Sequence, residues 1–184
     1  MIGFHGCDSS VANKVLAGSS HLKQSQNDYD WLGSGIYFWV DSYDRALDWA
    51  KKNKNIKNPY VVGAFIYPHN CLNLTDYGVG HELKNAYVVM RELYFAAGLP
   101  LPVNHPNSND VSLLRKLDCA VINFTHSLRE VKGELSFDTV YGVFEEGRPL
   151  YPNSALKEKT HVQIAVRNTD CIIGYFRPKE LSGH

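Results

Sequence analysis

The stretch that decides the fold is residues 31–40, WLGSGIYFWV. Two glycines lead into Ile36–Val40, an apolar and aromatic run that is typical of a β-strand. Successive side chains of a strand point to opposite faces, so Tyr37 and Trp39 share the face opposite Phe38. One aromatic face can pack in the core, while the other forms a flat wall for a planar ligand. A strand that simply belongs to an aromatic-rich core is the alternative.

Outward from this strand, the sequence predicts strands at both ends of the chain and helices between them. The predicted strands are residues 2–6, 36–40, 60–67, 139–144, 161–166 and 171–176, of which the apolar run 60–67 is expected to be covered on both faces. Four helices are predicted. The first begins at Asp8 or Ser9 and ends near Leu16, before Gly18, and the second begins at Asp41 or Ser42 and includes Ala50. The third extends from Gly80 to Ala97, and the fourth begins at Asn109 or Asp110 and includes Leu128. The polar residues 19–34 predict a loop. This order indicates an α+β fold and one domain over residues 1–184.

The composition is that of a folded domain. The chain has 184 residues, 44% of them hydrophobic, and 19 Lys and Arg balance 19 Asp and Glu. A chain of this length buries roughly 70% of its unfolded surface, and this composition excludes intrinsic disorder. The zero net charge gives no support to bulk attraction to nucleic acid. Four lysines and no acidic residue occur between Trp49 and Thr75, which fits either a local nucleic-acid contact or a solvated loop.

Patterns for membrane insertion and metal binding are lacking in the sequence. No apolar run approaches the roughly 18 residues that cross a bilayer, and the N-terminus lacks the regions of a signal peptide. Cys7, Cys71, Cys119 and Cys171 form no C-x-x-C pair, and the eight histidines show no ligand spacing. We therefore expect a cytoplasmic protein with reduced cysteines that binds neither metal nor membrane.

Two more segments carry candidate functional residues. His5 ends the opening strand, and Gly6 after it would let a ligand approach the main chain closely. Gln163 lies in the middle of the apolar strand 161–166, where burying an amide without partners costs about 1–3 kcal/mol. A partly solvated cleft would supply those partners. A histidine that satisfies a turn and a glutamine with a structural hydrogen bond are the plainer interpretations.

In combination these segments resemble a known family. His5-Gly6, then Gly35-Ile36-Tyr37-Phe38 about 30 residues later, then a capped helix, are similar to the NAD-binding half of ADP-ribosyltransferases. The similarity is to the diphtheria-toxin and poly(ADP-ribose) polymerase branch, with its His–Tyr–Glu signature. The closing strands within 137–176 complete the family's order of elements. The resemblance implies split antiparallel β-sheets that form a cleft for NAD+, with helices between and around them.

The resemblance also implies roles for individual residues. His5 would hydrogen-bond the ribose next to nicotinamide, the Gly6 backbone would hold the carboxamide, and Tyr37 would stack on the nicotinamide ring. Further contacts with the cofactor are assigned to Ser34 and Arg45.

A second stacking aromatic is usual in the family about 11 residues after the first. Asp48 stands at that spacing here, so Trp49, one residue later, is the substitute that we assign to cofactor binding. A core position for Trp49 is the alternative.

The main departure from the family is Gln163, which stands on the strand where the family has its catalytic glutamate. An amide can hydrogen-bond the ribose but cannot stabilise a developing cation by charge. The change argues against polymer elongation and leaves mono-ADP-ribosyl transfer, NAD+ hydrolysis or binding without turnover. Glu145 and Glu146 precede this strand in a loop that commonly contacts the acceptor in the family, so either is a candidate base or auxiliary acid.

The function expected from this resemblance is mono-ADP-ribosyl transfer by a toxin-like enzyme. ADP-ribose would pass from NAD+ to an RNA or DNA base or to a protein side chain, with release of nicotinamide and without a metal. Compact free-standing enzymes of this kind resemble toxins of bacterial toxin–antitoxin and antiviral defence systems, so an antitoxin is an expected partner. The alternatives are an NAD+ glycohydrolase and a catalytically silent module that binds NAD+ or ADP-ribose.

Overall fold

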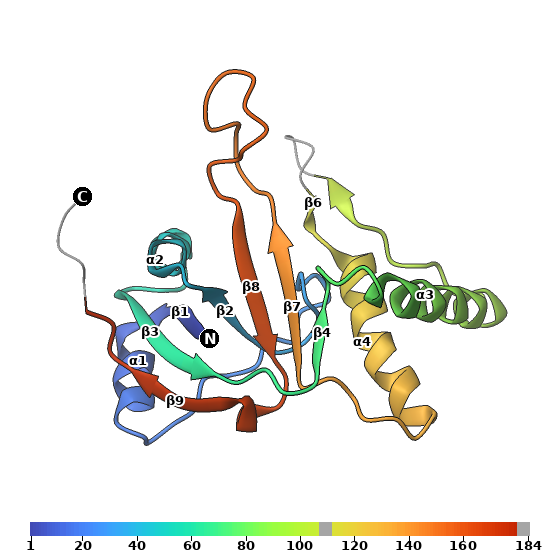
Figure 1. Cartoon of the computed structure of the whole chain (residues 1–184), viewed down its shortest axis with the longest axis horizontal. Coiled ribbons are helices and arrows are strands. Elements are labelled where there is room, and N and C mark those ends of the chain that lie inside the picture. Colours follow the sequence, from blue (N-terminus) through green and yellow to red (C-terminus); the bar gives the residue numbers. More distant parts are fainter. Residues whose placement is uncertain (107–111, 180–184) are drawn as a thin grey trace.

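A computed structural model describes residues 1–106 and 112–179 (Figure 1). The strands in this part of the chain are β1 (Ile2–Asp8), β2 (Ile36–Val40), β3 (Pro59–Ile66), β4 (Cys71–Asn73), β5 (His105–Pro106), β6 (Ser112–Leu114), β7 (Thr139–Phe144), β8 (His161–Val166) and β9 (Ile172–Phe176). The helices are α1 (Ser9–Leu16), α2 (Tyr43–Lys52), α3 (Val79–Ala96) and α4 (Lys116–Val131), with a 3₁₀ turn at Thr169–Cys171. The fold is α+β, as predicted.

A single sheet organises the molecule. Within the described residues its seven strands follow the order β4-β7-β8-β2-β1-β3-β9, and every neighbouring pair is antiparallel except β4 and β7. Strands β5 and β6 pair separately. Figure 1 shows α1 and α2 beside the β1–β3 half, whereas α3 and α4 lie beyond β4 and β7.

The predicted burial of β3 on both faces is confirmed. Val62 and Ala64 belong to the core cluster that includes Ala12 and Val15 of α1. Val61 belongs to a second cluster with Trp39 and with Ala46 of α2. The two helices therefore sandwich this half of the sheet, although Phe65 near the end of β3 is half exposed.

Helix α1 begins and ends as its sequence predicts. The Asp8 carboxylate accepts hydrogen bonds from the backbone N–H of Ser10 and, from the β3 side, of Lys57 and Asn58. These donors, with Asn58 the strongest, lower the pKa of Asp8 to about 2. At the other end Gly18 takes a left-handed conformation, with φ at 70°, that closes the helix.

Helix α4 begins later than its sequence pattern predicts. The predicted start at Asn109 or Asp110 lies outside the described residues, but residues 112–114 are strand β6 and the helix begins at Lys116. The side-chain oxygen of Asn104 accepts hydrogen bonds from Leu117 N at 2.9 Å and Asp118 N at 3.3 Å. A cap from a residue outside the helical segment therefore sets this boundary.

Within residues 1–106 and 112–179, none of the helices combines the length and the apolar character needed to cross a bilayer.

Candidate functional site

The site begins where β1 separates from β2. These strands pair through Gly3↔Val40 and Phe4↔Trp39, whereas β1 stays paired with β3 along its whole length. At the next residue of β1, a side chain connects the two strands in place of the backbone ladder. His5 Nδ1 donates a hydrogen bond to the Tyr37 carbonyl oxygen at 2.8 Å. The described strands thus form one continuous sheet rather than the two separate sheets that the resemblance implies, and the β1–β2 ladder within it is short.

The contact with Tyr37 defines the chemistry of His5. A carbonyl oxygen only accepts hydrogen bonds, so Nδ1 carries the proton and Nε2 is left as an acceptor. Burial lowers the pKa of His5 and outweighs the opposing effect of the bond to Tyr37. The side chain lines a cleft as a neutral imidazole.

Tyr37 is held in place through its hydroxyl group. The phenol donates to the Gly33 carbonyl oxygen at 2.7 Å and accepts from the Leu32 N–H at 2.8 Å. Burial raises the pKa of Tyr37 above its usual value. The hydroxyl therefore stays protonated and serves as an anchor, and the Tyr37 side chain lines the same cleft.

Gln163 reaches the cleft from β8. It pairs with Trp39 of β2 on one side and with Gly142 of β7 on the other, and it is 8% exposed. Among the described residues its amide has no hydrogen-bond partner, and the side chain lines the cleft. The donors and acceptor of this amide are therefore available to a ligand.

The cleft has a volume of about 710 Å³, which falls within the range of ligand sites. Its aromatic side chains are His5, Tyr29, Trp31, Tyr37, Trp39 and Trp49. Its charged side chains are Lys23, Asp30, Arg45, Asp48, Lys52, Glu146 and Lys159. Flat rings and mixed charges in one cavity suit a ligand with planar groups and a charged connection between them.

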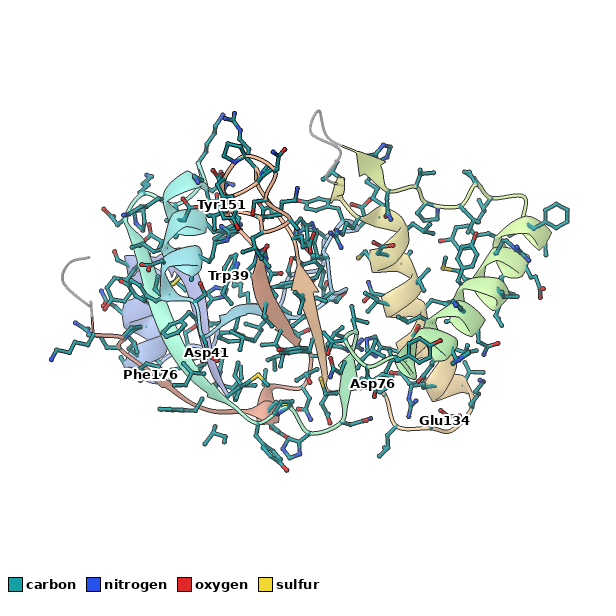
Figure 2. All side chains as sticks on the ribbon, turned by 45° about the horizontal axis from the view of Figure 1, so that its top comes forward. Trp39, Asp41, Asp76, Glu134, Tyr151 and Phe176 are labelled. Atoms are coloured by element: carbon teal, nitrogen blue, oxygen red, sulfur yellow. The ribbon has the colours of Figure 1, made fainter. Side chains whose placement is uncertain are left out.

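Two tryptophans form one wall of the cleft. The ring centres of Trp39 and Trp49 are 5.6 Å apart, with the rings inclined at 48°. Trp49 is 41% exposed, so it is not a core residue, whereas Trp39 is buried. Figure 2 shows Trp39 between α2 and β8. The structure thus provides a second aromatic surface here that includes the assigned Trp49.

A chain of ion pairs connects α2 to the loop before β8. Arg45 Nη2 lies 2.7 Å from a Glu146 oxygen, and Arg45 Nη1 lies 3.2 Å from a carboxylate oxygen of Asp48. Lys52 lies 2.5 Å from the other oxygen of Asp48. Arg45 therefore contributes to the cleft and orients both carboxylates.

The two glutamates that the sequence left as alternatives differ in their position relative to the cleft. Glu146 lines the cleft, and its carboxylate is 4.0 Å from Nδ1 of His161. Glu145 is exposed and does not line it. Of the two glutamates, Glu146 is therefore the one that lines the same cleft as Gln163.

Two residues assigned to the cofactor do not line the cleft. Gly6 is buried under α2, where a Cβ atom would stand 2.3 Å from the Ala46 carbonyl oxygen. Its lack of a side chain therefore lets α2 pack on β1. The Ser34 N–H donates to the side chain of Asn123 on α4 at 2.9 Å, so Ser34 helps to fix the loop before β2.

The loop before β2 supplies cleft residues that the sequence did not indicate. Ser25 and Gly35 exchange two backbone hydrogen bonds, of 2.8 and 3.1 Å, which close the loop against the start of β2. This closure brings Tyr29, Asp30 and Trp31 to the cleft. The only sequence signal for it was the run of aromatic and acidic residues directly before the glycine pair.

The lysine-rich stretch after α2 contributes little to the cleft. Of Lys51, Lys52, Lys54 and Lys57, all of which lie in the described part of the chain, only Lys52 is part of the cleft wall. Its ion pair with Asp48 already engages it.

No protein-family model and no solved structure matches the chain. The chain is similar to the uncharacterized protein MJ0359 of Methanocaldococcus jannaschii, with 27% identity over a match that covers 92% of this chain and 83% of that protein. Within residues 1–106 and 112–179, no three His, Cys, Asp or Glu residues are grouped as a metal site.

Proposed function

We propose that this protein is a mono-ADP-ribosyltransferase that binds NAD+ in the cleft and transfers ADP-ribose to a macromolecule. The observation that carries the proposal is that His5, Tyr37 and Gln163, which lie far apart in the sequence, line one cavity. They come from β1, β2 and β8, and the cavity opens where β1 leaves β2. This is the set of positions on which the resemblance to ADP-ribosyltransferases rests.

The reacting half of NAD+ suits these three side chains. The face of the Tyr37 ring would stack on nicotinamide, because the backbone bonds of its hydroxyl hold the ring still. Nε2 of His5 would accept a hydrogen bond from a ribose hydroxyl. The Gln163 amide, which has no partner within the described residues, would bind a second ribose hydroxyl.

The other half of NAD+ suits the wider part of the cleft. Trp39 and Trp49 offer ring faces for adenine, and Lys23 and Lys159 bring positive charge for the diphosphate. A dinucleotide with two planar ends and an anionic centre matches this distribution of rings and charge.

The reaction breaks the bond between nicotinamide and ribose. Nicotinamide leaves with the bonding electrons as a neutral molecule, the ribose carbon becomes cationic, and an acceptor atom attacks that carbon and loses a proton. Glu146 is the base that takes this proton, with Arg45 orienting its carboxylate at 2.7 Å. Gln163 positions the ribose without adding charge, so negative charge near the developing cation comes from Glu146.

The test is to incubate the purified protein with NAD+ labelled in the adenine and a cell lysate, followed by separate digestion with protease and nuclease. We expect label on a macromolecule together with free nicotinamide, and the digestions decide between a protein and a nucleic-acid acceptor. If no label is transferred and NAD+ stays intact, the proposed function is wrong.

One observation favours a second candidate function, which is binding without turnover. The strand position at which the family carries its catalytic acid holds the uncharged Gln163. A silent module that senses NAD+ predicts a thermal shift with NAD+ and no nicotinamide release. An NAD+ glycohydrolase, by contrast, releases nicotinamide at the same rate with and without lysate.

A toxin-like role can be tested separately from the chemistry. Expression of the wild-type chain in a bacterial host is expected to arrest growth, and expression of the Glu146→Gln variant is not. The matched control is Glu145→Gln, which changes a neighbouring glutamate outside the cleft and should arrest growth like the wild type. Equal growth with all three chains would contradict a toxic activity at this site.

A further inference from the structure

Helix α2 covers only part of the sheet face on which it packs. Val61 of β3 is buried with Ala46 of α2, and Gly63 and Phe65 lie on the same face further along the strand. There the cover ends, because Phe65 is 49% exposed and Ile2, which pairs with it from β1, is 36% exposed. The sheet beyond α2 therefore presents apolar side chains to solvent.

Three phenylalanine rings from three strands form most of this open surface. Phe4 of β1 and Phe176 of β9 both pair with Gly63. The ring centre of Phe176 is 6.3 Å from that of Phe4 and 4.8 Å from that of Phe65. A Cβ atom at Gly63 would stand 2.3 Å from Phe176, so the bare backbone of Gly63 accommodates this ring. We call the surface of Ile2, Phe4, Phe65 and Phe176 the aromatic face.

Charges of opposite sign flank the aromatic face. On one side the backbone N–H of Asp41 donates to the Ile2 carbonyl oxygen at 3.1 Å, and the Asp41 side chain is exposed. Asp44, in the first turn of α2, adds a second exposed acid. On the other side, Arg177 and Lys179 follow β9 directly and are exposed. The aromatic face thus has an acidic end and a basic end.

The two ends are too far apart to pair within one chain. Asp41 and Arg177 are separated by three strand spacings across the sheet and by three residues along β9, which is roughly 17 Å. Figure 2 shows Asp41 and Phe176 on the same side of the molecule. Within residues 1–106 and 112–179, Asp41, Asp44, Arg177 and Lys179 take part in none of the ion pairs.

We propose that the aromatic face binds the aromatic face of a second copy of this chain, with the acidic end of each copy opposite the basic end of the other. A two-fold rotation exchanges the two ends, so a surface with this arrangement is complementary to itself. A partner charged with one sign would be attracted at one end and repelled at the other. The zero net charge of the chain adds no long-range repulsion between copies.

The dimer leaves the cleft accessible. Ile2, Phe4, Phe65 and Phe176 do not line the cleft. Both copies can therefore bind a ligand while they are associated, and the inference does not rest on the proposed function.

Sedimentation equilibrium of the full chain over a series of concentrations tests the association. We expect monomers and dimers in equilibrium, with a dissociation constant in the micromolar range, because a small contact of this kind is weak. No larger species should form, since a two-fold contact uses the same surface on both copies and closes the assembly. A chain that stays monomeric up to about 1 mM, or that forms larger assemblies, would overturn the proposal.

Matched variants locate the contact. Phe65→Asp places a charge among the rings and is expected to weaken dimerisation by about 100-fold or more. Phe95→Asp is the control, because it makes the same change on α3 at a residue that is 88% exposed, and it should dimerise like the wild type. Wild-type dimerisation of Phe65→Asp, or a loss caused by Phe95→Asp alone, would show that the contact lies elsewhere. Circular dichroism checks that both variants fold.

A pair of exposed substitutions tests the arrangement without altering the rings. Arg177→Glu would bring like charges together and is expected to weaken dimerisation about tenfold. Asp41→Asn removes the opposing charge and suits the left-handed φ of 51° at this position, so adding it to Arg177→Glu should recover much of the loss. If the effects of the two substitutions simply add, Asp41 and Arg177 do not face each other and the proposed arrangement is wrong.

Discussion

The amide of Gln163 and the imidazole of His126 are both buried, and neither has a hydrogen-bond partner in the described part of the chain. Their surroundings differ. Gln163 faces a cleft of about 710 Å³, whereas His126 on α4 is 1% exposed and does not line that cleft. An unpaired polar group beside a cavity is available to a ligand, but one sealed in the interior lowers the free energy of unfolding by about 1–3 kcal/mol. Gln163 therefore belongs to a candidate ligand site, whereas His126 only lowers the stability of the fold.

The largest effect is expected at the cleft. Replacing Glu146 with Gln keeps the size of the side chain and removes the base, so transfer of ADP-ribose should fall about 100-fold or more. NAD+ binding should change little, because the proposed contacts with the dinucleotide are made by other side chains. The measurement is the initial rate of labelling together with an NAD+ titration. Glu145→Gln serves as the control, and a similar loss in both variants would remove Glu146 from the mechanism.

The buried imidazole of His126 is expected to make the stability of the protein depend on pH. Burial, with the charges of Arg167 and Arg129, lowers the pKa of His126 from 6.5 to about 3. Between these values the unfolded chain binds more protons than the folded chain, so stability is lost as the pH falls from about 6.5 towards 3. Between pH 7 and pH 4 we expect this group to lower the free energy of unfolding by about 3 kcal/mol.

Urea unfolding at several pH values checks this expectation. Burial lowers the pKa of His5 and His161 in the same direction, so the wild type alone does not isolate His126. The His126→Leu variant removes only its own contribution and should show a flatter pH profile and greater stability at pH 4 than the wild type. Parallel profiles for the two proteins would show that His126 is not the sensitive group.

The ring of Tyr37 has the next largest expected effect. Tyr37→Leu should weaken NAD+ binding by about 1–3 kcal/mol if nicotinamide stacks on the ring. Tyr37→Phe keeps the ring and loses only the anchoring bonds to Leu32 and Gly33, so its loss should be smaller. Tyr77→Leu, at a residue that is 95% exposed, is the control in the same titration. If Tyr37→Leu and Tyr37→Phe weaken NAD+ binding equally, the loss comes from the hydrogen bonds of the hydroxyl group and not from stacking on the ring.

Sequence patterns predicted most of the sheet because each strand buries at least one apolar face. The run 36–40 is apolar and aromatic throughout, the run 161–166 is mostly apolar, and most residues of both strands are buried. The start of α4 was missed because it depends on the hydrogen bond that the Leu117 N–H donates to the Asn104 side chain, and no periodicity records such a contact. Gly6 was interpreted as a ligand contact, but its constraint comes from α2, which packs on it from elsewhere in the sequence.

The candidate site was predictable to the level of strands but not of individual loop residues. Alternation placed Tyr37 and Trp39 on one face, and the amide of Gln163 suggested a cleft because a buried amide requires partners. The choice between Glu145 and Glu146 was not available from sequence, since the bond from Arg45 that orients Glu146 joins residues far apart in the chain. Trp31 reaches the cleft because Ser25 and Gly35 close its loop through backbone hydrogen bonds, and no side-chain pattern in the sequence records such bonds.

The smallest expected effect concerns the proposed role of Gln163 in binding the ribose. Replacing it with Ala removes hydrogen bonds between neutral groups, which contribute about 1 kcal/mol, so turnover should fall roughly tenfold. Because no described residue depends on this amide, stability should change far less than it does when a bonded buried group is removed. Steady-state rates, NAD+ affinity and thermal unfolding together distinguish the outcomes. Slower turnover with unchanged NAD+ affinity indicates a contact made in the transition state, and slower turnover with weaker binding indicates one made already with bound NAD+. An unchanged rate would place Gln163 with His126, as a buried polar group that no ligand uses.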